Sequence, residues 1–154
     1  MPDGPRYDDD FYAWTQYQAE VLRSLRTTDN RLDRENLAEE VEDLGKGERN
    51  AVYSQVTRIL EHFLKLAHSP ADRPRYGWIR SIVEARQELN RHLTPTLHDA
   101  AQQAFPSFYR DARKLAELGL RERGGHSAVE ALPQQCPYTL EQALARDWYP
   151  EPSK

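Results

Sequence analysis

The sequence predicts an all-α fold, a single-domain bundle of about five or six helices with a central acidic helix at about 33–44. At 154 residues the chain has the size of one domain, so 1–154 is expected to form a single helical unit. Apolar residues recur at the i, i+3, i+4 and i+7 spacing of amphipathic helices. Val, Ile and Thr are sparse and never alternate over a strand's length, which argues against a sheet.

Two helices are expected in the first third of the chain. The first begins at Asp8, Asp9 or Asp10, which can supply an N-cap, and runs to about Arg26. A polar loop follows at 27–32, and Asp33 can then cap the acidic helix. Each helix carries an apolar stripe that should face the core. The stripe of the first helix comprises Phe11, Trp14, Val21, Leu22 and Leu25, and that of the second comprises Leu37, Val41 and Leu44.

The acidic helix is followed by two glycines, Gly45 and Gly47, after which helical apolar spacing continues to about His68. One unbroken helix of about 35 residues would be about 52 Å long. That length exceeds the width of a compact domain of this size. We therefore expect a kink or break between the glycines, with one continuous helix as the alternative.

Four further helices are expected in the remainder. One runs from about Tyr76 to Leu93, and the next begins at Pro95 behind the N-cap Thr94 and ends near Gly119, with a kink at Pro106. Two capping-box patterns, at 127–130 and 139–142, predict short helices, the second ending near 146. Residues 1–7 and 151–154 are expected to be disordered tails.

Composition restricts the class of protein. The formal net charge of −4 argues against a nonspecific nucleic-acid binder. Cys136 is the only cysteine, so neither an internal disulfide nor a cysteine-based zinc site can form. No apolar run approaches the roughly 20 residues of a membrane span, and the acidic N-terminus lacks a signal-peptide core. We expect a cytoplasmic protein that does not contact a membrane.

Four stretches together resemble a known family. They are Phe11–Thr15, Glu35–Gly45, Leu60–Leu66 and Cys136–Thr139. In these stretches, and over nearly the whole chain, the sequence resembles the bacterial "domain of unknown function 29" family. The resemblance implies a small, all-helical bacterial protein, and it implies no activity.

The predicted functional cluster is polar. Glu35, Glu39 and Glu42 share one face of the acidic helix, at about 100° per residue. Carboxylates at i and i+3 can chelate a divalent ion, and a histidine from a packed neighbour can complete the site, so Glu39, Glu42 and His62 are candidate metal ligands. Lys65 lies one turn after His62. The alternative is a solvated acidic face, with Glu61 and Lys65 as an i, i+4 pair.

Arg86 falls within an apolar stripe of Trp78, Ile82 and Leu89. An arginine on a core-facing stripe must be paired, because an unpaired buried charge costs several kcal/mol. We predict that it pairs with Glu39 or Glu42 in a buried ion-pair network. The alternative is that Arg86 extends along the rim of the core.

In a basic stretch, Arg73–Arg91, the side chains of Arg73, Arg75, Arg80 and Arg91 are interleaved with Tyr76 and Trp78. Such a stretch can grip phosphates and stack a base. The negative net charge of the chain and the short length of the basic stretch favour a solvated face instead, so nucleic acid is not the expected partner.

The leading functional hypothesis is a non-enzymatic helical binding or regulatory module that acts through a protein partner. The sequence has no nucleophile elbow, phosphate loop or dinucleotide fingerprint, and no cofactor is expected beyond the candidate divalent metal. The alternative is a metal-dependent or hydrolytic enzyme that uses Glu39, Glu42 and His62. Nucleic-acid binding through Arg73–Arg91 is a weaker alternative, and the over-long helix leaves room for a homodimer.

Overall fold

The computed structural model describes residues 3–70, 74–122 and 124–152. Over these ranges the chain forms six helices and no strand, which confirms the all-α prediction. The helices are α1 (Phe11–Ser24), α2 (Arg34–His68), α3 (Arg75–His92), α4 (Pro95–Glu122), α5 (His126–Glu130) and α6 (Leu140–Leu144).

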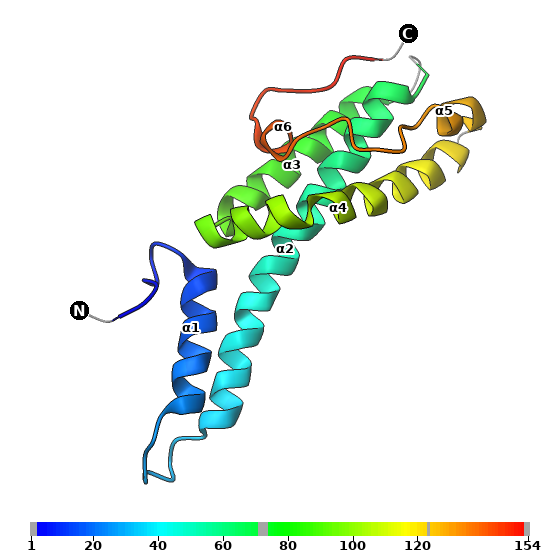
Figure 1. Cartoon of the computed structure of the whole chain (residues 1–154). Coiled ribbons are helices and arrows are strands. Elements are labelled where there is room, and N and C mark those ends of the chain that lie inside the picture. The colour runs from blue at the N-terminus through cyan, green and yellow to red at the C-terminus, as the bar shows by residue number, and fades with distance from the viewer. Residues whose placement is uncertain (1–2, 71–73, 123, 153–154) are drawn as a thin grey trace.

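The molecule is elongated and has two parts (Figure 1). We call α1 together with residues 34–51 of α2 the arm, because these two antiparallel helices stand away from the rest. We call residues 52–68 of α2, together with α3 to α6 and the C-terminal segment, the body. The main buried cluster begins at Val52 and contains no fully buried residue of α1. The arm therefore does not build the core, although α2 is the central helix of both parts.

The expected break between Gly45 and Gly47 is wrong, because α2 is a single helix of 35 residues. Each glycine in a helix interior costs about 1 kcal/mol relative to alanine. Gly45 is nevertheless buried against α1, where the lack of a side chain lets the two helices approach closely. The length argument failed because α2 does not cross a compact body: its acidic first third lies in the arm.

Side-chain caps place several helix starts where the sequence predicted them. Asp10 accepts a hydrogen bond from the Ala13 N–H at 3.0 Å, and Asp33 accepts one from the Asn36 N–H at 3.3 Å. Thr94 Oγ1 accepts from the Leu97 N–H at 3.2 Å ahead of α4, which continues through Pro106. The capping box of α6 is present, whereas α5 begins behind Gly125 without a side-chain cap, so the capping box predicted at 127–130 is wrong.

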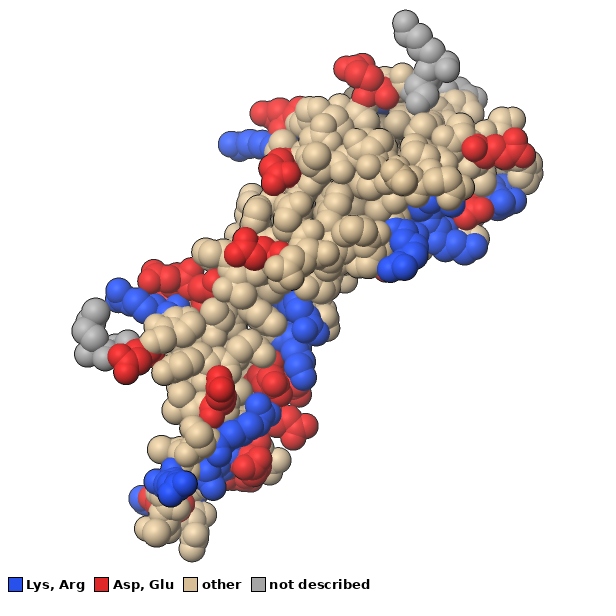
Figure 2. Space-filling view, in the orientation of Figure 1, with Lys and Arg blue, Asp and Glu red and all other residues tan. Residues whose placement is uncertain are grey.

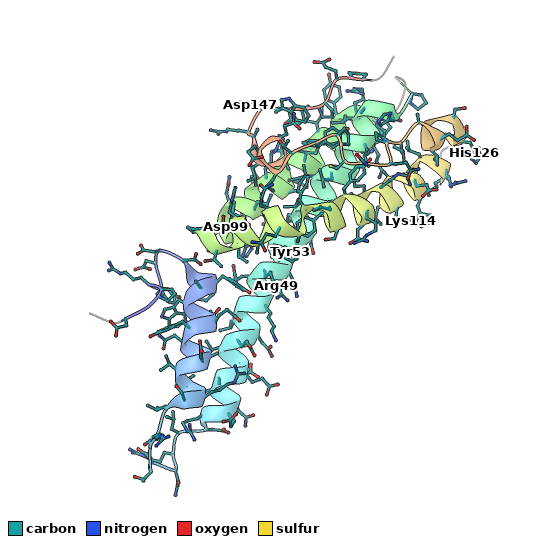
Figure 3. The ribbon with its side chains drawn as sticks, in the orientation of Figure 1. Arg49, Tyr53, Asp99, Lys114, His126 and Asp147 are labelled. Carbon is teal, nitrogen blue, oxygen red and sulfur yellow. The ribbon has the colours of Figure 1, made fainter. Side chains whose placement is uncertain are left out.

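Two polar contacts hold the arm at the body. The Thr96 N–H at the start of α4 donates to Asp10 Oδ2 at 2.8 Å, and Glu48 Oε2 lies 2.6 Å from His92 Nδ1 at the end of α3. At the same level Figure 3 shows Arg49 and Tyr53 where α2 passes into the body, with the guanidinium carbon 5.9 Å from the ring centroid. These contacts fix the root of the arm and leave its far end free.

The predicted tails lie partly outside the described residues, which exclude 1–2 and 153–154. Within the described part, Tyr7 packs edge-on against two aromatic rings of α1, with centroid distances of 5.1 Å to Phe11 and 4.9 Å to Trp14. The segment just before α1 is therefore anchored by aromatic contacts.

Candidate functional site

The six residues of the predicted polar cluster lie in three separate places. Glu35, Glu39 and Glu42 are in the arm, while His62 and Lys65 are at the far end of α2. Arg86 is on α3, within the body. The structure therefore does not bring them together into one site.

The candidate metal ligands illustrate the separation. Glu42 and His62 are twenty residues apart on one continuous helix, which corresponds to about 30 Å at 1.5 Å per residue. A single ion in one chain cannot bind both, so the proposed set of Glu39, Glu42 and His62 is wrong as one site. Among the described residues, no group of three His, Cys, Asp or Glu side chains is placed to hold a metal ion.

The predicted pairing of Arg86 is also wrong. Its side chain is 7% exposed and donates to four backbone carbonyls of the C-terminal segment: Ala143 at 2.9 Å, Gln142 at 3.0 Å, Trp148 at 2.8 Å and Arg146 at 3.3 Å. The guanidinium carbon also lies 5.6 Å from the ring centroid of Phe63 and 5.1 Å from that of Tyr149. Burial lowers the pKa of Arg86, and carbonyl dipoles take the place of a carboxylate.

A hollow of about 570 Å³ opens beside Arg86, lined in part by Gln87, Asn90 and Asp147. Because the guanidinium of Arg86 already donates hydrogen bonds to four carbonyls, we infer that it holds residues 142–148 against α3. We therefore interpret Arg86 as a structural residue.

At the far end of α2, Glu61 and Lys65 form the predicted i, i+4 pair. Lys65 Nζ lies 2.7 Å from Glu61 Oε2, and both side chains are largely buried, at 15% and 17% exposure. The lysine lies over Gly119 of α4, where a Cβ atom would come within 2.8 Å of Lys65 Cε. His62 Nδ1 lies 2.8 Å from the Arg58 carbonyl, and burial lowers the pKa of His62.

The basic stretch is mostly neutralised within the chain. Arg75 donates to the Leu66 carbonyl at 2.8 Å, Arg80 pairs with Glu84 at 3.1 Å, and Arg91 pairs with Glu88. Trp78 is buried in the core, and Arg73 lies outside the described residues. Trp78 is therefore not available to stack a base, as the hypothesis of nucleic-acid binding required.

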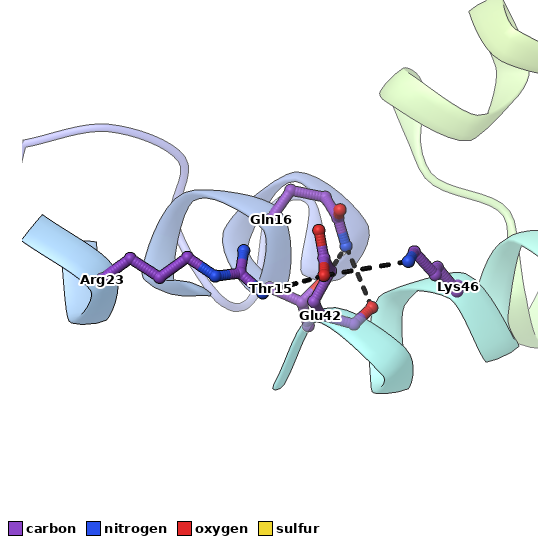
Figure 4. A network of polar contacts seen from close by, with 5 residues as sticks. All are labelled: Thr15, Gln16, Arg23, Glu42 and Lys46. Atoms are coloured by element: carbon purple, nitrogen blue, oxygen red, sulfur yellow. Dashed lines mark hydrogen bonds and ion pairs between the residues drawn. The ribbon is translucent and has the colours of Figure 1, made fainter. Parts of the chain in front are cut away.

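The arm has a polar face organised around Glu42 (Figure 4). Arg23 of α1 donates to Glu42 Oε2 at 3.0 Å, and Lys46 Nζ lies 3.7 Å from the same oxygen. The hydrogen bond from Arg23 is the main cause that lowers the pKa of the Glu42 carboxyl. Gln16 Nε2 adds a bond to the Glu42 carbonyl at 3.2 Å. These contacts tie α1 to α2 along one side of the arm.

The contact between the two arm helices is made by small side chains. Thr15, Ala19, Ala38 and Gly45 are all buried. This overturns the prediction that the leucine and valine stripes face the core. Val21, Leu25, Leu37 and Leu44 are instead 37%, 39%, 42% and 58% exposed. Leu22 and Val41, the other leucine and valine of the two stripes, are half-buried.

The exposed apolar residues of both helices lie on one side of the arm. Leu44 follows Glu42 on α2, and Val21 precedes Arg23 on α1, by two residues, or about 200° around each helix. Because the Arg23–Glu42 pair marks one face of the arm, Leu44 and Val21 point to the opposite side. Leu37 belongs to the stripe of Leu44, and Leu25 is the extended residue that directly follows α1. We call these four residues the apolar face of the arm; the sequence showed the stripes but not that they are uncovered.

A known protein family and a solved structure are similar to this chain. The model of the family described as "Domain of unknown function DUF29" matches residues 6–149. The chain belongs to this family. The solved structure of an α-helical protein of unknown function from Rhodospirillum rubrum is similar, with a TM-score of 0.80 and 28% identity over 93% of this chain and 91% of that one. The comparison with curated proteins finds no match.

The predicted absence of a membrane span has a structural counterpart. In the part of the chain that the structure describes, no helix combines the length and the apolar character needed to cross a lipid bilayer.

Proposed function

We propose that this DUF29 protein is a non-enzymatic binding module that acts through a protein partner, and that the arm is its docking element. The observation that carries the proposal is the apolar face, on which Leu44 is 58% exposed and Leu37 42% exposed. Covering apolar surface stabilises a complex by about 25 cal/mol per Å² removed from water. Grouped exposure of this kind is typical of interaction sites.

The division of the molecule supports the same proposal. The main core begins at Val52 and contains no fully buried residue of α1, although the partly buried Tyr12 of α1 packs against it. The arm is nevertheless ordered by caps at Asp10 and Asp33 and by the Arg23–Glu42 pair. An ordered element that lies mostly outside the core and presents leucines to solvent is suited to recognition by another macromolecule.

The rival hydrolytic hypothesis has lost its geometric basis. It required Glu39, Glu42 and His62 in one site, and α2 separates the last two by about 30 Å. Near His62, Glu61 and Lys65 form a largely buried ion pair that lies against Gly119. A binding role therefore accounts for more of the described surface than a catalytic one.

Site-specific photo-crosslinking in the native host tests the proposal. A benzophenone side chain would replace Leu44 on the apolar face or, as the matched control, Glu39 on the same helix. We expect a discrete protein adduct from position 44 and none from position 39. Equal adducts from both positions, or none from either, would refute docking through the apolar face.

A further inference from the structure

The arm is net negative. Its residues, Phe11–Ser24 and 34–51, include seven acidic and four basic side chains, a balance of −3. Three of the four basic groups have polar partners within the chain: Arg23 and Lys46 contact Glu42, and Arg34 donates to backbone carbonyls at the end of α1. Figure 2 shows acidic and basic side chains intermingled along the arm. Among the acids of α2 in the arm, Glu42 contacts Arg23 and Glu48 contacts His92.

One of these acids borders the apolar face, and a second lies farther out on the same helix. Glu40 lies three residues after Leu37 and four before Leu44, which places it beside both leucines on the outer edge of α2. Asp43 lies one turn after Glu40 and about 100° around the helix from Leu44, and both acids are exposed. No ion pair or side-chain hydrogen bond engages either one within the described chain. The edge thus offers uncompensated negative charge next to exposed leucines.

Glu35 and Glu39 occupy the opposite side of the same helix. Both are exposed, and both act electrostatically on Arg23 on the polar face. Around α2, Glu40 lies about 40–60° from Leu37 and Leu44, whereas Glu35 and Glu39 lie about 140–180° away from them. Glu35 and Glu39 therefore supply an internal control for charge on the far side of the helix.

We propose that the occupant of the apolar face is an amphipathic helix of a partner protein, with an apolar stripe flanked by lysine or arginine. The inference deepens the proposed function and rests on it. The stripe of the partner would lie on Leu25, Leu37 and Leu44, and its basic edge would face Glu40 and Asp43. Helix-in-groove recognition uses anchors at this i, i+3, i+4 and i+7 spacing. From 33 to 47, α2 presents about 21 Å, a length that a partner helix of about 14 residues matches.

Charge argues against a second copy of this chain as the occupant. Two arms placed face to face would bring a net-negative surface against its own copy. Like-charge juxtaposition at an interface costs several kcal/mol. A basic amphipathic helix meets the same leucines and neutralises Glu40 and Asp43.

Two synthetic peptides of about 18 residues, long enough to cover the arm, test the charge and the apolar contact separately. They share one leucine stripe at helical spacing, and one carries lysine flanks while the other carries glutamate flanks. Fluorescence anisotropy measures their binding to the full-length protein. The variants are E40K/D43K at the proposed edge, E35K/E39K as a control with the same change in net charge, and L37S/L44S on the apolar face.

We expect the wild-type protein to bind the lysine peptide at least about 10-fold more tightly than the glutamate peptide, as electrostatic complementarity requires. E40K/D43K should reverse this preference, E35K/E39K should leave it in place, and L37S/L44S should abolish binding of both peptides. This preference should weaken with added salt, because exposed charges are screened.

Each other outcome overturns a defined part of the reasoning. If the two peptides bind equally, or if E35K/E39K acts as strongly as E40K/D43K, the basic-helix occupant is refuted while docking through the leucines survives. If L37S/L44S binds both peptides as well as wild type does, or if wild type binds neither peptide, the apolar face is refuted as a helix-docking site. Sedimentation velocity that shows a dimer lost in L37S/L44S would identify a second copy as the occupant.

Discussion

Replacing Arg86 with methionine would test whether this arginine fastens the C-terminal segment to the body. The guanidinium donates to four carbonyls between Gln142 and Trp148, and its bond to Ala143 is fully buried. Methionine preserves an unbranched apolar chain and removes every donor. The carbonyls would then have to find other partners.

The expected loss follows from the burial of these bonds. Leaving the buried Ala143 carbonyl without a donor costs about 2 kcal/mol, and each of the three partly buried bonds contributes about 0.5–1 kcal/mol because water can replace the donor. The R86M variant should therefore lose about 4 kcal/mol of unfolding free energy. For a chain of this size that corresponds to a Tm lower by about 8–16 °C.

Urea unfolding followed by circular dichroism measures the loss, and limited proteolysis locates it. R86M should expose residues 141–150 to cleavage before the arm or α3. The matched control is R80M on the same helix, where the side chain is exposed and pairs with Glu84, so the change should stay below about 1 kcal/mol. If R86M unfolds within 1 kcal/mol of wild type, the anchoring role is wrong.

Three further predictions concern the arm and α2. A Cβ atom at position 45 would lie 3.2 Å from Thr15 Cβ and closer still to the Thr15 hydroxyl, whereas position 47 faces open space. The G45A variant should therefore lose about 1–3 kcal/mol of unfolding free energy and show faster amide exchange in α1. The G47A variant should show neither change. Burial lowers the pKa of His62 below its usual 6.5, so the unfolded state binds a proton more readily than the folded state does. The unfolding free energy should therefore fall as the pH drops below about 6.5. Urea melts from pH 7.5 to 5 should show a weaker fall in H62Q than in a variant of the exposed His126. One ion cannot span the separation of Glu42 and His62 along α2. In thermal melts with a panel of divalent metals, E42Q and H62Q should therefore not both abolish the same metal-dependent rise in Tm. A rise lost in both variants would contradict the single continuous helix.

The sequence predicted most of the helix boundaries because the signals there are local. Asp10, Asp33, Thr94 and Thr139 each bond to a backbone N–H within three residues, and the match between sequence and structure needs no distant contact. Glu61 and Lys65 pair for the same reason, one turn apart on one helix. The candidate site was less predictable because its contacts are distant in sequence.

Arg86 shows why distant partners were missed. Its position within an apolar stripe correctly indicated burial, and the charge correctly indicated a need for partners. Charge balance suggested carboxylates, yet the acceptors are backbone carbonyls more than fifty residues away in sequence. Every residue has a carbonyl, so no residue type marks these acceptors in the sequence.

The sequence by itself determined that this DUF29 chain is helical, where most helices begin, and which residues form apolar stripes. Those properties depend on periodicity and caps, which act over one or two turns. Only the tertiary structure decided which stripes are covered. Thr15, Ala19, Ala38 and Gly45 let α1 and α2 meet closely, and that contact leaves Leu25, Leu37 and Leu44 in solvent. The physical reason is that burial depends on which helix faces pack together, and packing is settled between helices rather than within one.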